Sequence, residues 1–350
     1  MQNLAAKGTS SATPVRVVIV DDSPSMRALL RTEIESASDL IVVGEAGDPY
    51  EARTVIKATN PDVITLDIEM PRMSGLDFLQ KIMRLRPTPV IMVSSLTDAG
   101  ARETIEAMAL GAIDCVVKPS VHFRNSFADL PAKIRAASQA HVKAHVPQVN
   151  MNAPVARGGN YDKIIAIGAS TGGVDALLTV LRRFPPDCPP TLIVQHMPKH
   201  FTASFAQRLA SKCAIQVVEA RDGERIHSGH AYIAPGSDTH MTLAAGPPLR
   251  IKLTEEPAES GHRPSVDTLF KSLAAHAPNV VCGLLTGMGA DGAINMKLLH
   301  DMGCSTVVQN EETCTVFGMP RAALRLGACK TSLPVEELAD ALLKRATSTS

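Results

Sequence analysis

The stretch GASTGGVD, residues 168–175, follows an apolar run and has the residue types to hold a phosphate or to present a nucleophile. A glycine-rich turn between a strand and a helix serves either purpose. A dinucleotide-binding turn, G-x-G-x-x-G, needs a glycine where this chain has Ser170, and the acidic residue expected about 20 residues later is missing. The sequence also lacks G-x-x-x-x-G-K-[ST]. Because the stretch does fit G-x-S-x-G, Ser170 is the candidate nucleophile.

A nucleophilic serine needs a general base and a group that orients the base. His196 ends the apolar run TLIVQH, and Asp291 lies in GMGADG, just after VVCGLLT. Since the carboxyl ends of parallel strands meet at one edge of a sheet, we predict that Ser170, His196 and Asp291 form a catalytic triad. The spacing alone leaves open that G-x-S-x-G occurs here by chance and that Asp291 is a helix cap. Zinc is not expected, because Pro198 separates His196 from His200 and no H-E-x-x-H motif occurs.

Acidic residues also gather at expected strand ends in the first half of the chain. Asp21 and Asp22 follow one apolar run and Asp67 ends another, while Ser94 and Lys118 end two more. Converging carboxylates repel each other, so the cluster predicts a Mg²⁺ site, with Lys118 and Ser94 available to contact a phosphate. A cap or turn role remains the alternative for Asp21 taken alone.

The elements that must position these residues follow a repeating pattern. Apolar runs at 15–20, 40–46, 62–67, 89–94 and 114–119 alternate with segments of helical periodicity. The pattern fades in the polar stretch 138–160 and starts again at residue 161. We therefore predict an α/β fold of two doubly wound, mainly parallel-sheet domains, at 14–135 and 160–346, joined by a linker at 136–159.

The bulk composition excludes several classes of protein. The 350 residues include 35 basic and 35 acidic side chains, which argues against nucleic-acid binding. No apolar run approaches the roughly 18 residues of a membrane span, and the first residues lack the apolar segment of a secretory signal. The seven cysteines are scattered without a C-x-x-C pair, which favours a reduced protein. We expect a cytoplasmic protein without membrane insertion, and a monomer.

The blocks VVIVDDSPSMR, VITLDIEMPRMSGLDFL, VIMVSS and VVKP resemble the response-regulator receiver domain. The resemblance implies a flavodoxin-like fold and phosphorylation of Asp67 by a sensor histidine kinase of the chemotaxis pathway. It implies that Asp21, Asp22 and Asp67 hold Mg²⁺, and that Ser94 and Lys118 contact the phosphate.

One position departs from that resemblance. Many receivers carry an aromatic switch residue three positions before the lysine, and this chain has Cys115 there. Rotation of an aromatic ring therefore cannot transmit the signal. We expect a rearranged contact between the two domains to do so instead.

The blocks IGASTGGVDAL, LIVQHMPKHFTASFAQRL, IAPGSDTHM, HRPSVDTLF and LLTGMGADGA resemble the protein-glutamate methylesterase domain of bacterial chemotaxis. The resemblance implies a Rossmann-like three-layer domain whose nucleophile, base and acid are Ser170, His196 and Asp291. The backbone N–H of Thr171, next to the nucleophile, is the default oxyanion donor. The resemblance adds the backbone N–H of Met288.

Together the two resemblances imply a phosphorylation-activated serine hydrolase. Its substrates would be methylated glutamate side chains of methyl-accepting chemoreceptors, with deamidation of receptor glutamines implied as well. Hydrolysis would need no cofactor, and the receiver would lie over the mouth of the esterase site in the inactive state. One alternative is a non-catalytic, phosphorylation-controlled receptor-binding module. The other is a transcriptional regulator, and the absence of a short helix–turn–helix pattern disfavours that second alternative.

Overall fold

The computed structural model describes residues 13–119, 126–142, 163–236 and 238–347. Most of the predicted linker, 136–159, lies outside these residues, so the predicted domain boundaries stay predictions. The described strands form a five-stranded sheet, a seven-stranded sheet and a separate two-stranded pair. The last helix beside the first sheet ends at Ser138, and the first strand of the second sheet begins at Ile164. No helix in this part of the chain combines the length and the apolar character needed to cross a membrane.

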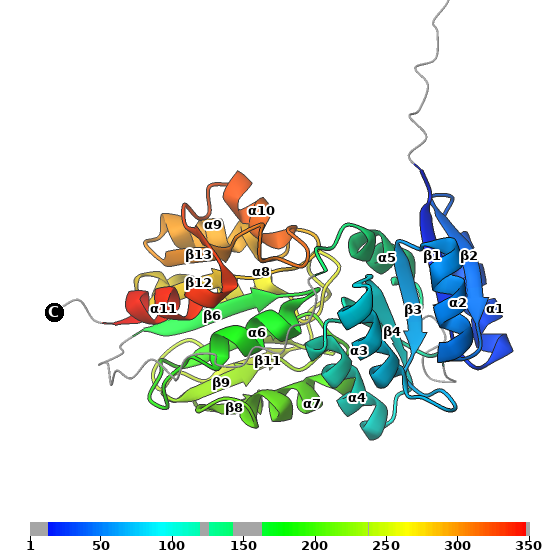
Figure 1. Ribbon diagram of the computed structural model, residues 1–350. Coiled ribbons are helices and arrows are strands. Elements are labelled where there is room, and N and C mark those ends of the chain that lie inside the picture. Colours follow the sequence, from blue (N-terminus) through cyan, green and yellow to red (C-terminus); the bar gives the residue numbers. More distant parts are fainter. Residues whose placement is uncertain (1–12, 120–125, 143–162, 237, 348–350) are drawn as a thin grey trace, which may run out of the picture.

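The first sheet has five strands in the order β2-β1-β3-β4-β5, and all of its pairs are parallel. Helices α2, α3 and α4 cover one face, and α1 and α5 cover the other (Figure 1). This confirms the doubly wound fold predicted for the first half. The elements are β1 Val15–Val20, α1 Pro24–Glu35, β2 Leu40–Ala46, α2 Pro49–Thr59, β3 Val63–Asp67, α3 Gly75–Leu85, β4 Val90–Ser94, α4 Asp98–Ala109, β5 Asp114–Val117 and α5 Leu130–Ser138.

The second sheet has seven strands in the order β14-β13-β12-β6-β7-β9-β8, again with parallel pairs throughout. The first part of the second domain contains β6 Ile164–Ala169, α6 Gly173–Leu181, β7 Thr191–Gln195, α7 Lys199–Ala210, β8 Gln216–Glu219, β9 His230–Ile233, β10 His240–Leu243 and β11 Ile251–Thr254. Its second part contains α8 Val266–Ser272, the 3-10 helix Ala274–Asn279, β12 Val280–Leu284, α9 Ala293–Asp301, β13 Ser305–Gln309, α10 Met319–Arg325, β14 Ser332–Leu333 and α11 Val335–Ala346.

The second domain has three layers. Helices α6, α7 and α11 pack on one face of the sheet. Helices α8, α9 and α10 pack on the other face, together with the antiparallel pair β10–β11. This confirms the three-layer α/β fold. The pair β10–β11 stands where a doubly wound fold would repeat a helix, and the sequence pattern did not indicate it.

The two domains are in direct contact. Helix α4 of the first domain packs against α7 and α6 of the second, and Figure 1 shows α4 beside α7. One cluster of buried apolar side chains continues from the first domain into the second. The contact therefore has a hydrophobic core, which is the feature that makes an interface between domains stable.

Candidate active site

The three predicted triad residues come from the central strands of the second sheet. Strand β6 lies between β7 and β12. Ser170 follows β6, His196 follows β7, and Asp291 lies in the loop between β12 and α9. The chain passes from β6 to β7 on one side and returns through β12 on the other, so a crevice opens at the end of β6. The topology brings all three residues to this crevice.

The turn at Ser170 depends on its glycines. Gly172 has a φ of 78°, in the left-handed region, and a Cβ there would lie 2.3 Å from Thr315 Oγ1. A Cβ on Gly173 would lie 2.0 Å from the side-chain oxygen of Gln195. Only glycine permits this sharp connection from β6 to α6, because other residues would be strained or would collide with their neighbours. The turn presents Ser170 as a nucleophile elbow does.

His196 and Asp291 form a direct pair. His196 Nε2 lies 2.8 Å from Asp291 Oδ2, and both side chains are nearly buried. The same carboxylate accepts from Ser265 Oγ at 2.8 Å, from the Val266 amide at 2.7 Å and from the Asp267 amide at 3.0 Å. Burial raises the pKa of Asp291, but the bonds from His196 and the amides outweigh it and lower the pKa to about 2. A charged carboxylate only accepts hydrogen bonds, so neutral His196 carries its proton on Nε2.

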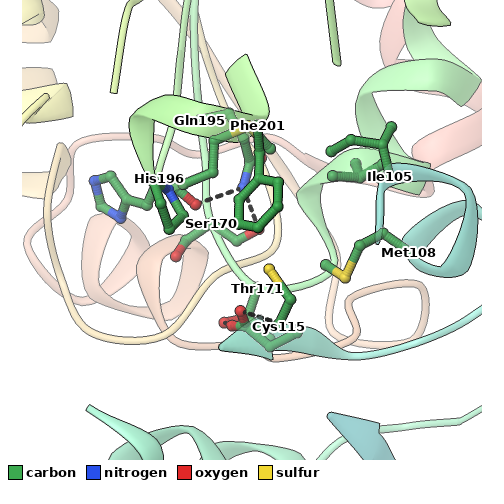
Figure 2. Close-up of a pocket in the computed structure, with 12 residues that line it drawn as sticks. Ile105, Met108, Cys115, Ser170, Thr171, Gln195, His196 and Phe201 are labelled. Atoms are coloured by element: carbon green, nitrogen blue, oxygen red, sulfur yellow. Dashed lines mark hydrogen bonds between the residues drawn. The ribbon is translucent and has the colours of Figure 1, made fainter. Parts of the chain in front are cut away.

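The remaining nitrogen of His196 is available to act as a base. Nδ1 is buried and has no hydrogen-bond partner among the described residues. Ser170 and His196 line the same pocket (Figure 2). Within the described part of the chain, neither the Ser170 hydroxyl nor Nδ1 takes part in a hydrogen bond. The structure therefore contains the hydrogen bond between His196 and Asp291 but not one between Ser170 and His196. Such links are often loose without substrate.

Two residues that sequence reasoning missed hold the candidate nucleophile and the candidate base in place. Gln195 Nε2 donates to the backbone oxygen of Ser170 at 2.9 Å and to that of His196 at 3.1 Å. The backbone oxygen of Thr286 accepts from the Ser170 amide at 3.0 Å, and its hydroxyl donates to the Thr171 carbonyl at 3.0 Å. The sequence signal for Gln195 was an amide side chain at the end of the apolar run TLIVQ. The structure shows that this amide is buried.

The predicted oxyanion donors come from two loops, one that carries the candidate nucleophile and one that lies against it. In the described ranges, the backbone N–H groups of Thr171 and Met288 make no hydrogen bond. The loop that carries Met288 lies against the nucleophile, since a Cβ on the preceding Gly287 would come within 2.7 Å of Ser170 Cβ. The Met288 side chain has no hydrogen to donate, so only its backbone N–H is suited to the role.

The pocket at Ser170 lies between the two domains. Its space for solvent is about 20 Å³, which is room for one water molecule. The first domain contributes α4 and the start of β5, and Figure 2 shows Met108 and Cys115 facing the Ser170 side of the pocket. Burial raises the pKa of the Cys115 thiol to about 12, so it stays neutral. The lining residues are Ile105, Met108, Asp114, Cys115, Ser170, Thr171, Val174, Gln195, His196, Met197, Pro198 and Phe201.

A hydrogen bond joins the first domain to the residue after the nucleophile. Thr171 Oγ1 donates to Asp114 Oδ2 at 2.8 Å. The other carboxylate oxygen, Asp114 Oδ1, accepts from Lys133 Nζ at 2.8 Å and from the Cys115 amide at 2.8 Å. Asp114 is thereby fixed in the first domain and held against the candidate oxyanion site.

The acidic residues of the first domain form a compact cluster. Asp21, Asp22 and Asp67 each offer an oxygen, and these oxygens all lie within 4.8 Å of one another. Lys118 Nζ lies 2.8 Å from Asp67 Oδ2 and 3.4 Å from Asp21 Oδ2, forming an ion pair with each carboxylate. Burial raises the pKa of Asp67 to about 6 and also raises that of Asp21. Converging carboxylate oxygens suit Mg²⁺, which prefers such ligands.

Ser94 lies at the end of β4, but its hydroxyl is directed toward α4. It accepts from Thr104 Oγ1 at 2.7 Å and donates toward the backbone oxygens of Ser95 and Gly100 at 3.1 and 3.3 Å. No bond from Ser94 to Asp67 occurs among the described contacts. The structure therefore brings Lys118 to the acidic cluster and leaves Ser94 bonded to the adjoining helix.

Comparisons with known proteins agree with this architecture. The model of the CheB methylesterase family matches residues 165–342, and that of the response regulator receiver domain matches residues 17–125. A protein-glutamate methylesterase/protein-glutamine glutaminase of Rhizobium etli is 48% identical over 336 residues, covering 95% of this chain and 97% of the relative. A protein of the same name from Salmonella typhimurium is 49% identical over 341 residues, again covering 95% and 97%.

A solved structure resembles the second domain. The CheB methylesterase catalytic domain of Thermotoga maritima is 35% identical, with a TM-score of 0.51, and the match covers 52% of this chain and 97% of that one. The match to each of the two curated relatives covers nearly the whole of this chain and nearly the whole of the relative. This chain therefore belongs to the CheB methylesterase family, with a response regulator receiver domain ahead of the catalytic domain.

Proposed function

We propose that this protein is a phosphorylation-activated esterase that removes methyl groups from glutamate side chains of chemoreceptors and deamidates receptor glutamines. The observation that carries the proposal is the buried His196–Asp291 pair, whose imidazole lines the same pocket as Ser170 on its glycine turn. The names of the relatives support an enzyme and give no support to the non-catalytic alternative. Release of methanol from methylated receptor membranes tests the proposal.

The first half of the reaction forms an acyl-enzyme. Ser170 Oγ attacks the ester carbonyl while its proton passes to His196 Nδ1, because Nε2 is occupied by Asp291. The backbone N–H groups of Thr171 and Met288 stabilise the negative oxygen of the tetrahedral intermediate. His196 then returns the proton to the departing methoxide, so methanol leaves and the glutamyl group stays on Ser170.

The second half releases the product. His196 Nδ1 takes a proton from water, whose oxygen attacks the acyl carbon, and then returns the proton to Ser170 Oγ. Glutamate leaves and the enzyme is regenerated. With a glutamine substrate the leaving group is ammonia in place of methanol, and every other step is the same. Asp291 holds the tautomer of His196 and stabilises its charged form throughout.

The first domain receives the activating signal. A sensor histidine kinase of the chemotaxis pathway would transfer a phosphoryl group to Asp67, and we propose that this occurs in the cytoplasm on a monomeric protein. Asp21, Asp22 and Asp67 would hold Mg²⁺, which neutralises charge around the transferred phosphoryl group. Lys118 stays paired to the site, since Asp67 raises its pKa against the opposing effect of burial.

Mg²⁺ is expected to stabilise the first domain, because it relieves the repulsion among the three carboxylates. Magnesium at 10 to 100 times its Kd should add about 1–3 kcal/mol to the free energy of unfolding. The Asp21→Asn variant should lose this increment, whereas Asp77→Asn, an exposed change on α3, should keep it. Thermal unfolding with and without Mg²⁺ measures both, and an equal increment in Asp21→Asn would contradict the site.

We propose that the described arrangement is the inactive one. A pocket with space for one water has no room for a glutamate methyl ester. Two contacts of the first domain maintain this inactive arrangement. Ile105 and Met108 form an apolar cover over the pocket, and Asp114 accepts a hydrogen bond from Thr171. Phosphorylation would then act by weakening this contact. A shift of the usual size for coupled sites, about 1–3 kcal/mol, is sufficient.

Asp114→Ala is expected to raise the rate of the unphosphorylated protein about fivefold, because one charged hydrogen bond between the domains contributes about 1 kcal/mol or more. The measurement is methanol release without a phosphodonor. Asp129→Ala is the matched control, since Asp129 also pairs with Lys133, at 3.4 Å, but is exposed and does not line the pocket. An unchanged or lower rate for Asp114→Ala alongside an unchanged control would contradict the covering role.

A further inference from the structure

A second histidine lies flat against the candidate base. The imidazole rings of His262 and His196 are stacked, with centroids 3.9 Å apart and planes 10° from parallel. The contact leaves the edge of His196 free, so Nε2 still reaches Asp291 at 2.8 Å. His196 is thus held by a hydrogen bond at one edge and by an aromatic ring on one face.

The chain builds a tight turn that places His262. Glu259 and His262 exchange two backbone hydrogen bonds, at 3.1 and 2.9 Å, around Ser260 and Gly261. Both central residues have positive φ, 54° and 82°, as a two-residue hairpin turn of type I′ requires. The Glu259 carboxylate accepts from Thr268 Oγ1 at 2.8 Å. The turn is therefore fixed to α8.

The same helix also orients the acid. The residues at the start of α8 donate three hydrogen bonds to Asp291, from Ser265 Oγ and from the amides of Val266 and Asp267. One helix thus fixes both groups that hold the base, the carboxylate at its edge and the imidazole on its face. A hydrogen bond at one edge still allows the ring to tilt about the bond, and a stacked ring opposes that tilt.

We propose that His262 is a positioning residue that keeps the imidazole of His196 in the plane needed to accept the proton of Ser170 and that stabilises the imidazolium through its π face. The inference rests on the proposed hydrolytic function. When His196 gains a proton, its charge lies over a neutral aromatic ring at 3.9 Å, within the range of a cation–π contact. Asp291 supplies the opposite charge at the edge.

This role needs a neutral His262. Burial, followed by the neighbouring His196, lowers the pKa of His262 to about 4, while Asp291 opposes the shift. Near neutral pH the ring therefore presents an uncharged face to His196, and it does not repel the imidazolium. A lysine or arginine in this place would repel it.

The experiment compares His262→Ala with His262→Phe in the full-length protein. We expect kcat for methanol release to fall about tenfold or more in the alanine variant, with KM changed less than about twofold, because a tilted base costs rate rather than binding. The phenylalanine variant keeps a flat neutral ring and should stay within about threefold of the parent. His227→Ala is the matched control: its ring also touches an imidazole, that of His230, but the pair is tilted by 54° and does not line the pocket.

A second measurement separates this inference from the proposed function. A fluorophosphonate, which labels activated serines whatever their natural substrate, should label the parent faster than Ser170→Ala and should label His262→Ala about tenfold more slowly than the parent. The downfield NMR signal of the His196 Nε2–H should shift or broaden in His262→Ala and persist in His262→Phe.

Equal labelling rates for the parent and His262→Ala would overturn this inference but not the proposed function. A loss of activity in His262→Phe as large as in His262→Ala would also overturn it, because that result would make His262 a proton carrier. Labelling of the parent no faster than Ser170→Ala overturns the hydrolytic function and this inference with it. Circular dichroism and thermal unfolding of both variants establish that they are folded.

Discussion

Ser170→Ala is expected to lower methyl ester hydrolysis at least about 10⁴-fold, because no other step of the reaction replaces the lost nucleophile. Binding of methylated receptor membranes should be unchanged, since the hydroxyl makes no hydrogen bond among the described residues and its removal leaves the elbow intact. Methanol release and co-sedimentation with receptor membranes measure the two properties separately.

Ser228→Ala is the control for this change. Ser228 is exposed in the loop before β9 and does not line the pocket, so its variant should match the parent in both assays. A Ser170→Ala protein that kept a tenth of the parent rate would rule out the serine mechanism. Loss of receptor binding in the same variant would show that the pocket recognises receptors through Ser170.

A small-molecule phosphodonor with Mg²⁺ is expected to raise the rate of the full-length protein about 5–150-fold, the usual range for coupling between two sites. Asp67→Asn should abolish the increase, because the amide cannot form the acyl phosphate. Asp77→Asn should retain it. The measurement is methanol release before and after addition of the phosphodonor.

We expect the signal from the proposed phosphorylation site, Asp67, to reach the pocket through Ser94 and α4. The Ser94 hydroxyl bonds to Gly100 in the first turn of α4 and to Thr104 in its middle, and the residue after Thr104, Ile105, lines the pocket at Ser170. A phosphoryl group on Asp67 adds a strong acceptor that competes for Lys118 and for the Ser94 hydroxyl. We expect α4 to lose these bonds and to release its contact with α6 and α7. Equal rates with and without phosphodonor, in protein shown to be phosphorylated, would contradict this path.

The fold was largely predictable because burial and periodicity are local signals. The apolar runs at 15–20 and 40–46 coincide with β1 and β2, and IIAIG, TLIVQ and VVCGL fall in β6, β7 and β12. Fully buried parallel strands read as continuous apolar runs, and their carboxyl ends had to meet. The pair β10–β11 was missed because each strand has only four residues and a mixed burial pattern.

The candidate site was predictable only where single residues carried the chemistry. Ser170, His196 and Asp291 follow strands whose ends converge, so topology alone brought them to one crevice. His262 lies on a loop turn after β11, and no strand pattern indicates where such a turn will point. The bond between Thr171 and Asp114 joins surfaces of two domains, and residue spacing does not define how two domains dock. The side-chain direction of Ser94 depends on a rotamer, which sequence also leaves undefined.

The proposed cover over Ser170 belongs to the same polypeptide as the serine, and this determines how the repression would scale with the amount of protein. A tethered inhibitor meets its target at an effective concentration of order millimolar, set by the connecting chain rather than by the amount of protein in the cell. We therefore expect the balance between closed and open molecules to be independent of expression level. A cell that makes twice as much of this protein would double both populations, and the fraction able to act would follow the phosphorylation state.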